Sequence, residues 1–510
     1  MCHLGKKLKV ALLFPRSAEK NYHPPLGPAY LAAVLRQAGH EVMAIDAAAP
    51  KICCTDQDIK DMVDAFNPDI VGISFNIYLA LNAYALSRVL SSSKYLLLAG
   101  GPHATTCAGE VLKNNFDFAV RGEGETAMLA LAERVGRGEA FTDLAGISYL
   151  KNGRVISNPE GPLISDLDAI PYPAVDLFPR AHYEQTMSCQ HGGYIVTSRG
   201  CPFSCGFCFK TFGGRSYRIR SAENILKEMN HANRQYGVED FYIVDETFTV
   251  DPRRVQELSS LMEKNPKPYR WMTNSRVDTV DRTSLKQLKK AGCYALAYGF
   301  ESGDQESLNR ISKDASVEKA EEVIRWTQEA GIDVRGYIMI GFPWETTENA
   351  ENTYRFVRRN QKNICSYLGM AFAIPFPGTN FYNDHKDEHQ LEGWWLNQDI
   401  INCYALGDWL PIHHKIYFND IRLLRRDYLF PHDKKTKKVY KRIAKLMGDT
   451  NFQAAFPPER YSPSKRCIIY FIIKSSQFLF HRSPKLCYLY MRMLLPFAKR
   501  YTKRLYELLK

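Results

Sequence analysis

Short apolar runs alternate with amphipathic helical patterns along most of the chain, and this alternation constrains the fold more than any other feature. Five runs lie between residues 8 and 122, and six more lie between 194 and 374. Strands separated by helices form parallel sheets, because each helix carries the chain back to the start of the next strand. The sequence therefore predicts an α/β protein with two parallel sheets.

The first set of runs predicts a doubly wound, Rossmann-like sheet within residues 1–160. Its strands are LKVALLF, HEVMAID, DIVGISF, YLLLAGG and FDFAVRG. Ligands of such sheets lie beyond the carboxyl ends of the strands. The residues expected there are Pro15, Asp46, Ser74 to Asn76, Gly100 to Thr105 and Arg121 to Glu125.

A dinucleotide does not suit this sheet. The turn after the first strand is long and broken by prolines, and it has no G-x-G-x-x-G to bring a pyrophosphate onto a helix. The GGPHAT turn at Gly100 to Thr105 favours close backbone approach to a bulky ligand, although a tight strand-to-helix turn explains it as well. Residues 146–156 predict a hairpin with an Asn-Gly turn, and 161–189 a proline-rich linker.

The second set of runs predicts a β/α barrel of six units within residues 190–383. Its strands are YIVTS, DFYIVD, YRWMT, YALAYG, VRGYIMIG and LGMAFAI. Right-handed crossovers between parallel strands build such barrels, and their active residues lie at the carboxyl ends of the strands. Arg218 and Arg220 either pair with a carboxylate or the cofactor, or lie in solvent at a helix start.

The first strand of this barrel leads into TSRGCPFSCGFCFK, which places Cys201, Cys205 and Cys208 in a C-x3-C-x2-C array. Thiolates this close are stabilised chiefly by a shared metal centre. A closed zinc site would need Cys189 or His191 as a fourth ligand, and buried free thiols are a further alternative. An iron–sulfur cluster with one open iron suits three thiolates better.

The array resembles the radical S-adenosylmethionine (SAM) signature. In that family the open iron of a 4Fe-4S cluster chelates SAM, and an electron from the cluster releases a 5'-deoxyadenosyl radical. The resemblance implies SAM contacts, at the array and at later strand ends, for Phe207, Asp245, Glu246, Glu301, Ser302, Ile340 and Gly341. Asp245 and Glu246 could instead cap a helix.

The first domain followed by this motif resembles the cobalamin-binding radical SAM enzymes, through PPLGPAYLAAVLRQAGHEV, GGPHAT and RGEGE. The resemblance implies a cobalamin-binding domain with contacts from Ser74, Asn76, Gly100, Gly101, His103, Thr105, Gly122 and Glu123. D-x-H-x-x-G, whose histidine ligates cobalt in other cobalamin proteins, is missing. Cobalamin is therefore expected to bind without a protein histidine, with His103 structural or in contact with the nucleotide tail.

Transfer of a methyl group from methylcobalamin to an unactivated carbon is the activity that this resemblance implies first. The alternatives are an anaerobic oxidative cyclase without methyl transfer and a non-enzymatic cobalamin or iron–sulfur sensor. The expected partners are a small substrate, lipid-like or apolar, and an electron donor such as flavodoxin or ferredoxin. The sequence does not identify the substrate or further catalytic residues.

The composition predicts a reduced cytoplasmic protein, because 13 cysteines show no pairing pattern and no signal peptide is apparent. The whole net charge of +12 falls after residue 383, in a region expected to be helical. A nucleic-acid enzyme would carry this charge around its active domain. The basic, aromatic stretch 467–501 could lie on an anionic membrane surface, or form packed helices with basic edges.

Overall fold

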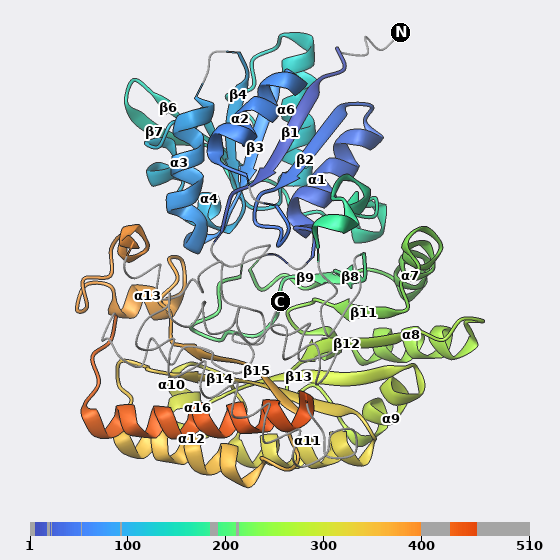
Figure 1. Cartoon of the computed structure of the whole chain (residues 1–510), viewed down its shortest axis with the longest axis vertical. Helices are drawn as coiled ribbons and strands as arrows, with labels where there is room; N and C mark the ends of the chain where they lie inside the picture. Colours follow the sequence, from blue (N-terminus) through green and yellow to red (C-terminus); the bar gives the residue numbers. More distant parts are fainter. Residues whose placement is uncertain are drawn as a thin grey trace, which may run out of the picture.

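The structure is a computed structural model, and it describes residues 6–17, 21, 23–52, 54–91, 94–183, 192–210, 214–398 and 429–455. Figure 1 shows the N-terminal sheet with its helices, in blue, above a second sheet in green to orange. Most of the predicted basic region, including 467–501, lies outside the described residues, as do Cys189 and His191.

The N-terminal sheet has seven strands in the order β2-β1-β3-β4-β5-β6-β7. The first five are parallel, and β6 and β7 add an antiparallel hairpin at the edge. This order confirms the predicted doubly wound sheet and the hairpin. The strands are Lys9–Phe14, Glu41–Asp46, Ile70–Ser74, Leu96–Gly100, Phe118–Val120, Ile147–Lys151 and Arg154–Ser157 for β1 to β7.

Helices cover both faces of this sheet, which explains why β1 is buried from Val10 to Leu13 without alternation. Local signals set the helix ends: Thr55 forms a capping box with Asp58, and Gly138 ends α6 in the left-handed conformation. The helices are Leu26–Gln37, Asp56–Phe66, Ala80–Leu90, Pro102–Thr106, Ala108–Leu112 and Gly124–Arg137 for α1 to α6.

The predicted linker is packed against the first domain through short 3-10 helices, Leu167–Ala169, Val175–Leu177 and Arg180–His182. Phe178 and Tyr183 are buried in a cluster with Ala29 and Ala49. The Tyr183 hydroxyl donates to Asp46 Oδ2 over 3.0 Å. Asp46, a predicted strand-end residue, therefore anchors the linker.

The second sheet has six parallel strands in the order β8-β11-β12-β13-β14-β15, which confirms the predicted six-unit partial barrel. Its strands are Tyr194–Ile195, Asp240–Ile243, Arg270–Ser275, Cys293–Glu301, Asp333–Ile340 and Ser366–Phe372. Its helices are Ala222–Tyr236, Pro252–Lys264, Arg282–Lys290, Gln305–Arg310, Val317–Glu329, Thr347–Arg359 and Asn380–His385 for α7 to α13.

Helix α16 (Lys434–Ala455) packs beside α12 and against the edge strand β15 (Figure 1). Its Asn451 accepts from the Tyr367 backbone N–H over 2.7 Å and donates to the Tyr367 carbonyl over 2.9 Å. These bonds satisfy strand groups that an open edge would leave unpaired. No helix in the described ranges is both long and apolar enough to cross a membrane.

Candidate cofactor site between the two sheets

The cysteine array lies on the loop that follows β8. Strand β9 (Ser198–Arg199) pairs with β10 (Arg218–Ile219), so the two ends of the loop are held together. The middle of the loop is fixed from two sides: the Gly206 N–H donates to the Ile311 carbonyl over 2.8 Å, and the Phe381 N–H donates to the Gly206 carbonyl over 2.9 Å.

The three thiols of this loop form a fitting donor set for an iron–sulfur cluster. Cys201 is buried, with its Sγ 3.9 Å from Thr247 Oγ1, and Cys205 and Cys208 are partly buried. Burial, assisted by the nearby Glu246 carboxylate, raises the pKa of the Cys208 thiol to about 12. Thiolate is therefore unfavourable there without a metal, and binding of iron would supply the missing positive charge.

Arg276, at the carboxyl end of β12, bonds directly to the array. Its Nη1 lies 3.2 Å from Cys205 Sγ, and its guanidinium carbon lies 3.8 Å from the centre of the Phe203 ring. Asp278 holds the same guanidinium through two bonds of 2.9 and 2.8 Å. A buried cation thus donates to a cluster-ligand position, an arrangement that stabilises negative charge on sulfur.

The adjacent acids Asp245 and Glu246, after β11, have different surroundings. Asp245 is fully buried, and its oxygens accept from the backbone and hydroxyl groups of Thr197 and Ser198 over 2.5 to 3.1 Å. Arg254 donates to it as well, over 3.3 Å. Asp245 therefore holds the strand that leads into the cysteine loop.

Glu246 points into a cavity and keeps its carboxylate available to a ligand. Its surface is exposed to this cavity, yet enclosure by the protein raises the pKa of the carboxyl group, with Lys210 opposing and Asp245 assisting the shift. A carboxylate in such a place gains most from a cationic partner such as an amino group.

Glu301 is the last residue of β13, and Ser302 follows it at a strained turn. Glu301 has φ +62°, a conformation that non-glycine residues keep mainly where the surroundings impose it. Its Oε1 accepts from Lys313 Nζ over 2.9 Å. Ser302 is buried, and its hydroxyl bonds Thr353 Oγ1 over 3.0 Å and accepts from the Asp304 N–H over 3.1 Å.

Ile340 is the buried last residue of β14, and Gly341 begins the turn that follows, at a position that requires glycine. Gly341 has φ +77°, and a Cβ there would lie 2.6 Å from the Phe372 ring. Its N–H donates to Glu345 Oε2 over 2.6 Å, and the Tyr440 hydroxyl of α16 donates to the same oxygen over 2.6 Å. Helix α16 therefore supports this turn.

A cavity of about 470 Å³ lies where the carboxyl ends of the two sheets meet. Its walls are mainly apolar. The N-terminal domain contributes Phe14, Tyr30, Leu31, Ser74, Gly100, Gly101, Gly122 and Met128, and the barrel contributes Val196, Ser198, Arg199, Gly200, Val244 and Glu246. A ligand in this cavity would contact both domains.

Glycines on the N-terminal side leave room for a bulky group. A Cβ added to Gly27, Gly100 or Gly122 would meet no atom within 4 Å, although all three line the cavity. Gly101 differs, because its φ of +91° and the Phe75 carbonyl 2.8 Å from a Cβ require glycine for the turn itself. A wall that is open at glycines and otherwise mainly apolar fits the approach of a large ring system such as cobalamin.

Four other predicted cobalamin contacts do not line this cavity. Asn76 caps the helix that follows β3, and Thr105 bonds the backbones of Gly101 and Gly122. His103 is fully buried, with its Nε2 3.0 Å from the Tyr84 hydroxyl and 3.2 Å from Glu110. Glu110 also accepts from the Trp395 indole, so this network joins the first domain to the chain beyond the barrel.

Glu123, the fourth predicted cobalamin contact outside the cavity, joins the two domains through ion pairs. Arg218 donates to both of its oxygens over 2.7 and 3.0 Å, and Arg199 lies 3.4 Å away. Burial opposes ionisation of Glu123, but the arginine bonds outweigh it and lower its pKa. Glu125 accepts from Arg199 over 2.5 Å. The RGEGE motif thus pairs with arginines on both sides of the cysteine loop, whereas Arg220 pairs with Glu228.

Sequence reasoning missed His23, Tyr30, Arg199 and Arg276. Arg199 stands two residues before Cys201, so its place in the array was an available signal. His23 lies in a loop, Tyr30 in α1 and Arg276 directly after β12, and only the packing of the two sheets brings them to the cavity or the array.

Comparisons with known proteins agree with this geometry. The model of the B12 binding domain matches residues 18–132, and that of the radical SAM superfamily matches 195–357. An uncharacterized methyltransferase of Pyrococcus horikoshii is 32% identical over 74% of this chain and 83% of its own length. The anaerobic magnesium-protoporphyrin IX monomethyl ester cyclase of Rubrivivax gelatinosus is 26% identical over 85% of this chain and 80% of its own.

Among solved structures, the fold is similar to the radical S-adenosylmethionine methyltransferase TsrM from Kitasatospora setae, with cobalamin and a 4Fe-4S cluster bound. The TM-score is 0.60, at 17% identity over 75% of each chain. The chain is thus a radical SAM enzyme with an N-terminal B12 domain. It belongs to the cobalamin-binding radical SAM enzymes, whose cofactors are a 4Fe-4S cluster, SAM and cobalamin.

Proposed function

We propose that this enzyme transfers a methyl group to an unactivated carbon of a small, fairly apolar substrate. The observation that carries the proposal is the shared cavity, in which Gly100 of the first sheet and Glu246 of the second line the same space. When bound, the cluster and SAM supply a carbon-centred radical, and cobalamin supplies the methyl group.

The residues at the two strand-end edges would have different roles: those of the barrel would hold the cluster and SAM, and those of the N-terminal sheet would contact cobalamin. On the barrel edge, Cys201, Cys205 and Cys208 hold the cluster, and Glu246 accepts from the amino group of SAM. Glu301 and the turn at Ile340 and Gly341 shape the SAM site, with Phe207 beside the adenine. Asp245 and Ser302, whose polar atoms already have partners, position the strand ends.

On the N-terminal edge, the cavity-lining residues Ser74, Gly100, Gly101 and Gly122 would contact cobalamin. Asn76, His103, Thr105 and Glu123 support this edge from behind, through the bonds described above. The apolar lining would exclude water from a reactive radical, which favours an apolar substrate.

A comparison of metabolites, including lipids, from cells with and without the gene tests the proposal. Cells are supplied with methyl-labelled methionine, and the expected result is a product that carries the label and disappears with the gene. The three-cysteine variant, in which Cys201, Cys205 and Cys208 are replaced by Ala, cannot hold the cluster. It is the control for cells that express an inactive protein. Unchanged labelling of all metabolites would contradict methyl transfer.

An oxidative cyclase is the second candidate, favoured by the cyclase relative that aligns with 85% of this chain. The same experiment distinguishes it, since a newly ringed or desaturated product would appear without label. A non-enzymatic sensor would make no deoxyadenosine when the reduced protein is incubated with SAM.

The remaining proposals concern organisation and partners. We assign residues 1–160 to cobalamin binding, 161–189 to the linker, 190–383 to the radical SAM core and 384–510 to a basic helical region. A flavodoxin or ferredoxin in the cytoplasm would supply the electron.

Contact of residues 467–501 with anionic membranes is a separate proposal. It is tested by flotation of the full chain with anionic liposomes at low and high salt, where binding that is unaffected by salt contradicts an electrostatic attachment.

A further inference from the structure

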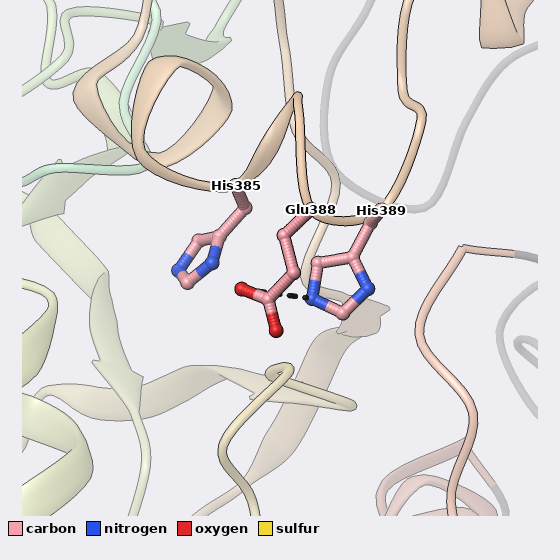
Figure 2. A group of neighbouring side chains, drawn as sticks. All are labelled: His385, Glu388 and His389. Carbon is pink, nitrogen blue, oxygen red and sulfur yellow. Dashed lines mark ion pairs between the residues drawn. The ribbon is translucent and has the colours of Figure 1, made fainter.

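A group of side chains of the types that bind metals lies outside the cavity, at the end of α13. The sequence His385-Lys386-Asp387-Glu388-His389 places two histidines four residues apart with a carboxylate between them. One potential ligand atom from each of His385, Glu388 and His389 lies within 4.8 Å of the other two. Figure 2 shows the Glu388 carboxylate between the two imidazole rings.

The backbone brings the two histidines onto one side. The His389 N–H donates to the His385 carbonyl over 3.1 Å, so a helical turn continues past the end of α13. Side chains four residues apart on such a turn face the same way. Zinc-bound nitrogen atoms lie about 2.0 to 2.1 Å from the ion. The two imidazoles and the carboxylate would therefore rotate toward a common ion, and the backbone conformation would stay the same.

The packing around His385 gives a second observation. Its Nδ1 is buried and has no hydrogen-bond partner among the described residues. The ring is held by Phe381 and Trp344, with centroids 5.3 and 5.8 Å away, and Phe430 lies 4.9 Å from the His389 ring. A buried polar nitrogen without a partner is costly, and a metal ion would satisfy an imidazole nitrogen at this place.

The geometry points to a divalent transition-metal site, of the zinc class, formed by His385, Glu388 and His389. Two imidazoles and one carboxylate suit zinc better than calcium or magnesium, which prefer oxygen ligands alone. The Glu388 side chain is 73% exposed, so a fourth position is open to water. None of the three residues lines the cofactor cavity.

The site would stabilise the support of the cysteine loop. Helix α13 has six residues, too few to be stable alone, and its Phe381 N–H is a bond donor to Gly206 between Cys205 and Phe207. A metal at the end of α13 would fix this helix next to Phe430, which leads into α16. The role is structural, and it holds whether or not the proposed methyl transfer is correct.

The full chain, reconstituted anaerobically with its cluster and then with zinc, tests this inference. After dialysis we expect about one zinc ion per chain, and X-ray absorption at the zinc edge should show imidazole scattering. The His385→Gln/His389→Gln variant should bind zinc at least about tenfold more weakly and keep its iron. His231→Gln, a histidine exchange on α7, is the matched control and should retain zinc.

Zinc bound to the cysteine loop would show sulfur at about 2.3 Å instead of imidazole. Zinc with sulfur ligands only, or no zinc retained by the full chain, overturns the site. The zinc-edge X-ray absorption spectrum of the unmodified protein distinguishes the two sites even if the double variant does not fold.

Discussion

The two strand-end edges that face the cavity are built in opposite ways. At the barrel edge, polar side chains are bonded to one another: Asp245 to Thr197 and Ser198, and Arg276 to Asp278 and Cys205. Of these residues only Ser198 lines the cavity itself. On the N-terminal edge, glycines and apolar side chains leave open space. One edge provides ligands held in place, and the other provides room, which suits a metal cluster on one side and a large macrocycle on the other.

The largest effect is expected from the thiols of the barrel edge. Replacing Cys201, Cys205 and Cys208 by Ala should remove the cluster absorption and lower deoxyadenosine formation by at least about a thousandfold, because these thiolates hold three irons of the cluster and leave the fourth open to SAM. Cobalamin binding should persist. Cys365→Ala, which removes a thiol directly before β15, is the control. Cluster retention by the triple variant would contradict the assignment.

The N-terminal edge should respond to bulk instead of charge. Gly100→Leu places a side chain where nothing lies within 4 Å of a Cβ, so the fold is preserved and the cavity is filled. We expect cobalamin affinity to fall by about a hundredfold or more, equal to about 3 kcal/mol, with the cluster unchanged. Equilibrium binding of cobalamin measures this. Gly109→Leu, outside the cavity, should bind normally, and normal binding by Gly100→Leu would place cobalamin elsewhere.

The comparison between the edges also shows how far sequence reasoning reaches. The parallel sheets, the hairpin and the cysteine loop were predicted from hydrophobic periodicity, an Asn-Gly turn and cysteine spacing, because all three are local properties. Which polar residue faces a ligand depended on packing. Asp245 and Glu246 are adjacent and chemically alike, yet one is saturated with hydrogen bonds and the other lines the cavity. No local pattern separates them, since Ser198 and Thr197, which make four of the bonds to Asp245, lie 47 and 48 residues away.

Glu345 connects the turn after β14 to Tyr440 of α16, and its protonation should make the stability of the protein depend on pH. Burial raises its pKa to about 7, against the opposing hydrogen bonds from Tyr440 and Gly341. A raised pKa means that the folded state binds the proton more tightly, so this contribution to stability is present below the unfolded pKa of 4.5 and is lost as pH rises through about 7.

Glu345→Gln should remove this dependence. Anaerobic denaturant unfolding at pH 5 and pH 8 should show that the variant gains stability relative to the parent at the higher pH, by up to about 3 kcal/mol. A difference between variant and parent that stays constant with pH would show that Glu345 is ionised throughout.

The smallest expected effect is a change in the reduction potential of the cluster. Arg276→Gln removes a cation that donates to Cys205 Sγ, so the more negative, reduced cluster loses stabilisation. The reduction potential should fall by on the order of tens of millivolts. Arg270→Gln exchanges an arginine at the opposite end of the same strand and is the control. An unchanged potential in Arg276→Gln, measured by anaerobic titration, would mean that the bond to Cys205 is lost when the cluster is bound.

The central claim is that cobalamin in the cavity and the cluster on the cysteine loop, which follows the cavity-lining Gly200, lie close together, and magnetic interaction between them tests it most directly. In the holoenzyme containing cob(II)alamin, power saturation of the cobalt resonance is measured with the cluster oxidised and with it reduced to its paramagnetic form. We expect faster relaxation of the cobalt signal only when the cluster is reduced, and no such change in the three-cysteine variant. Identical saturation in both states would contradict this proximity.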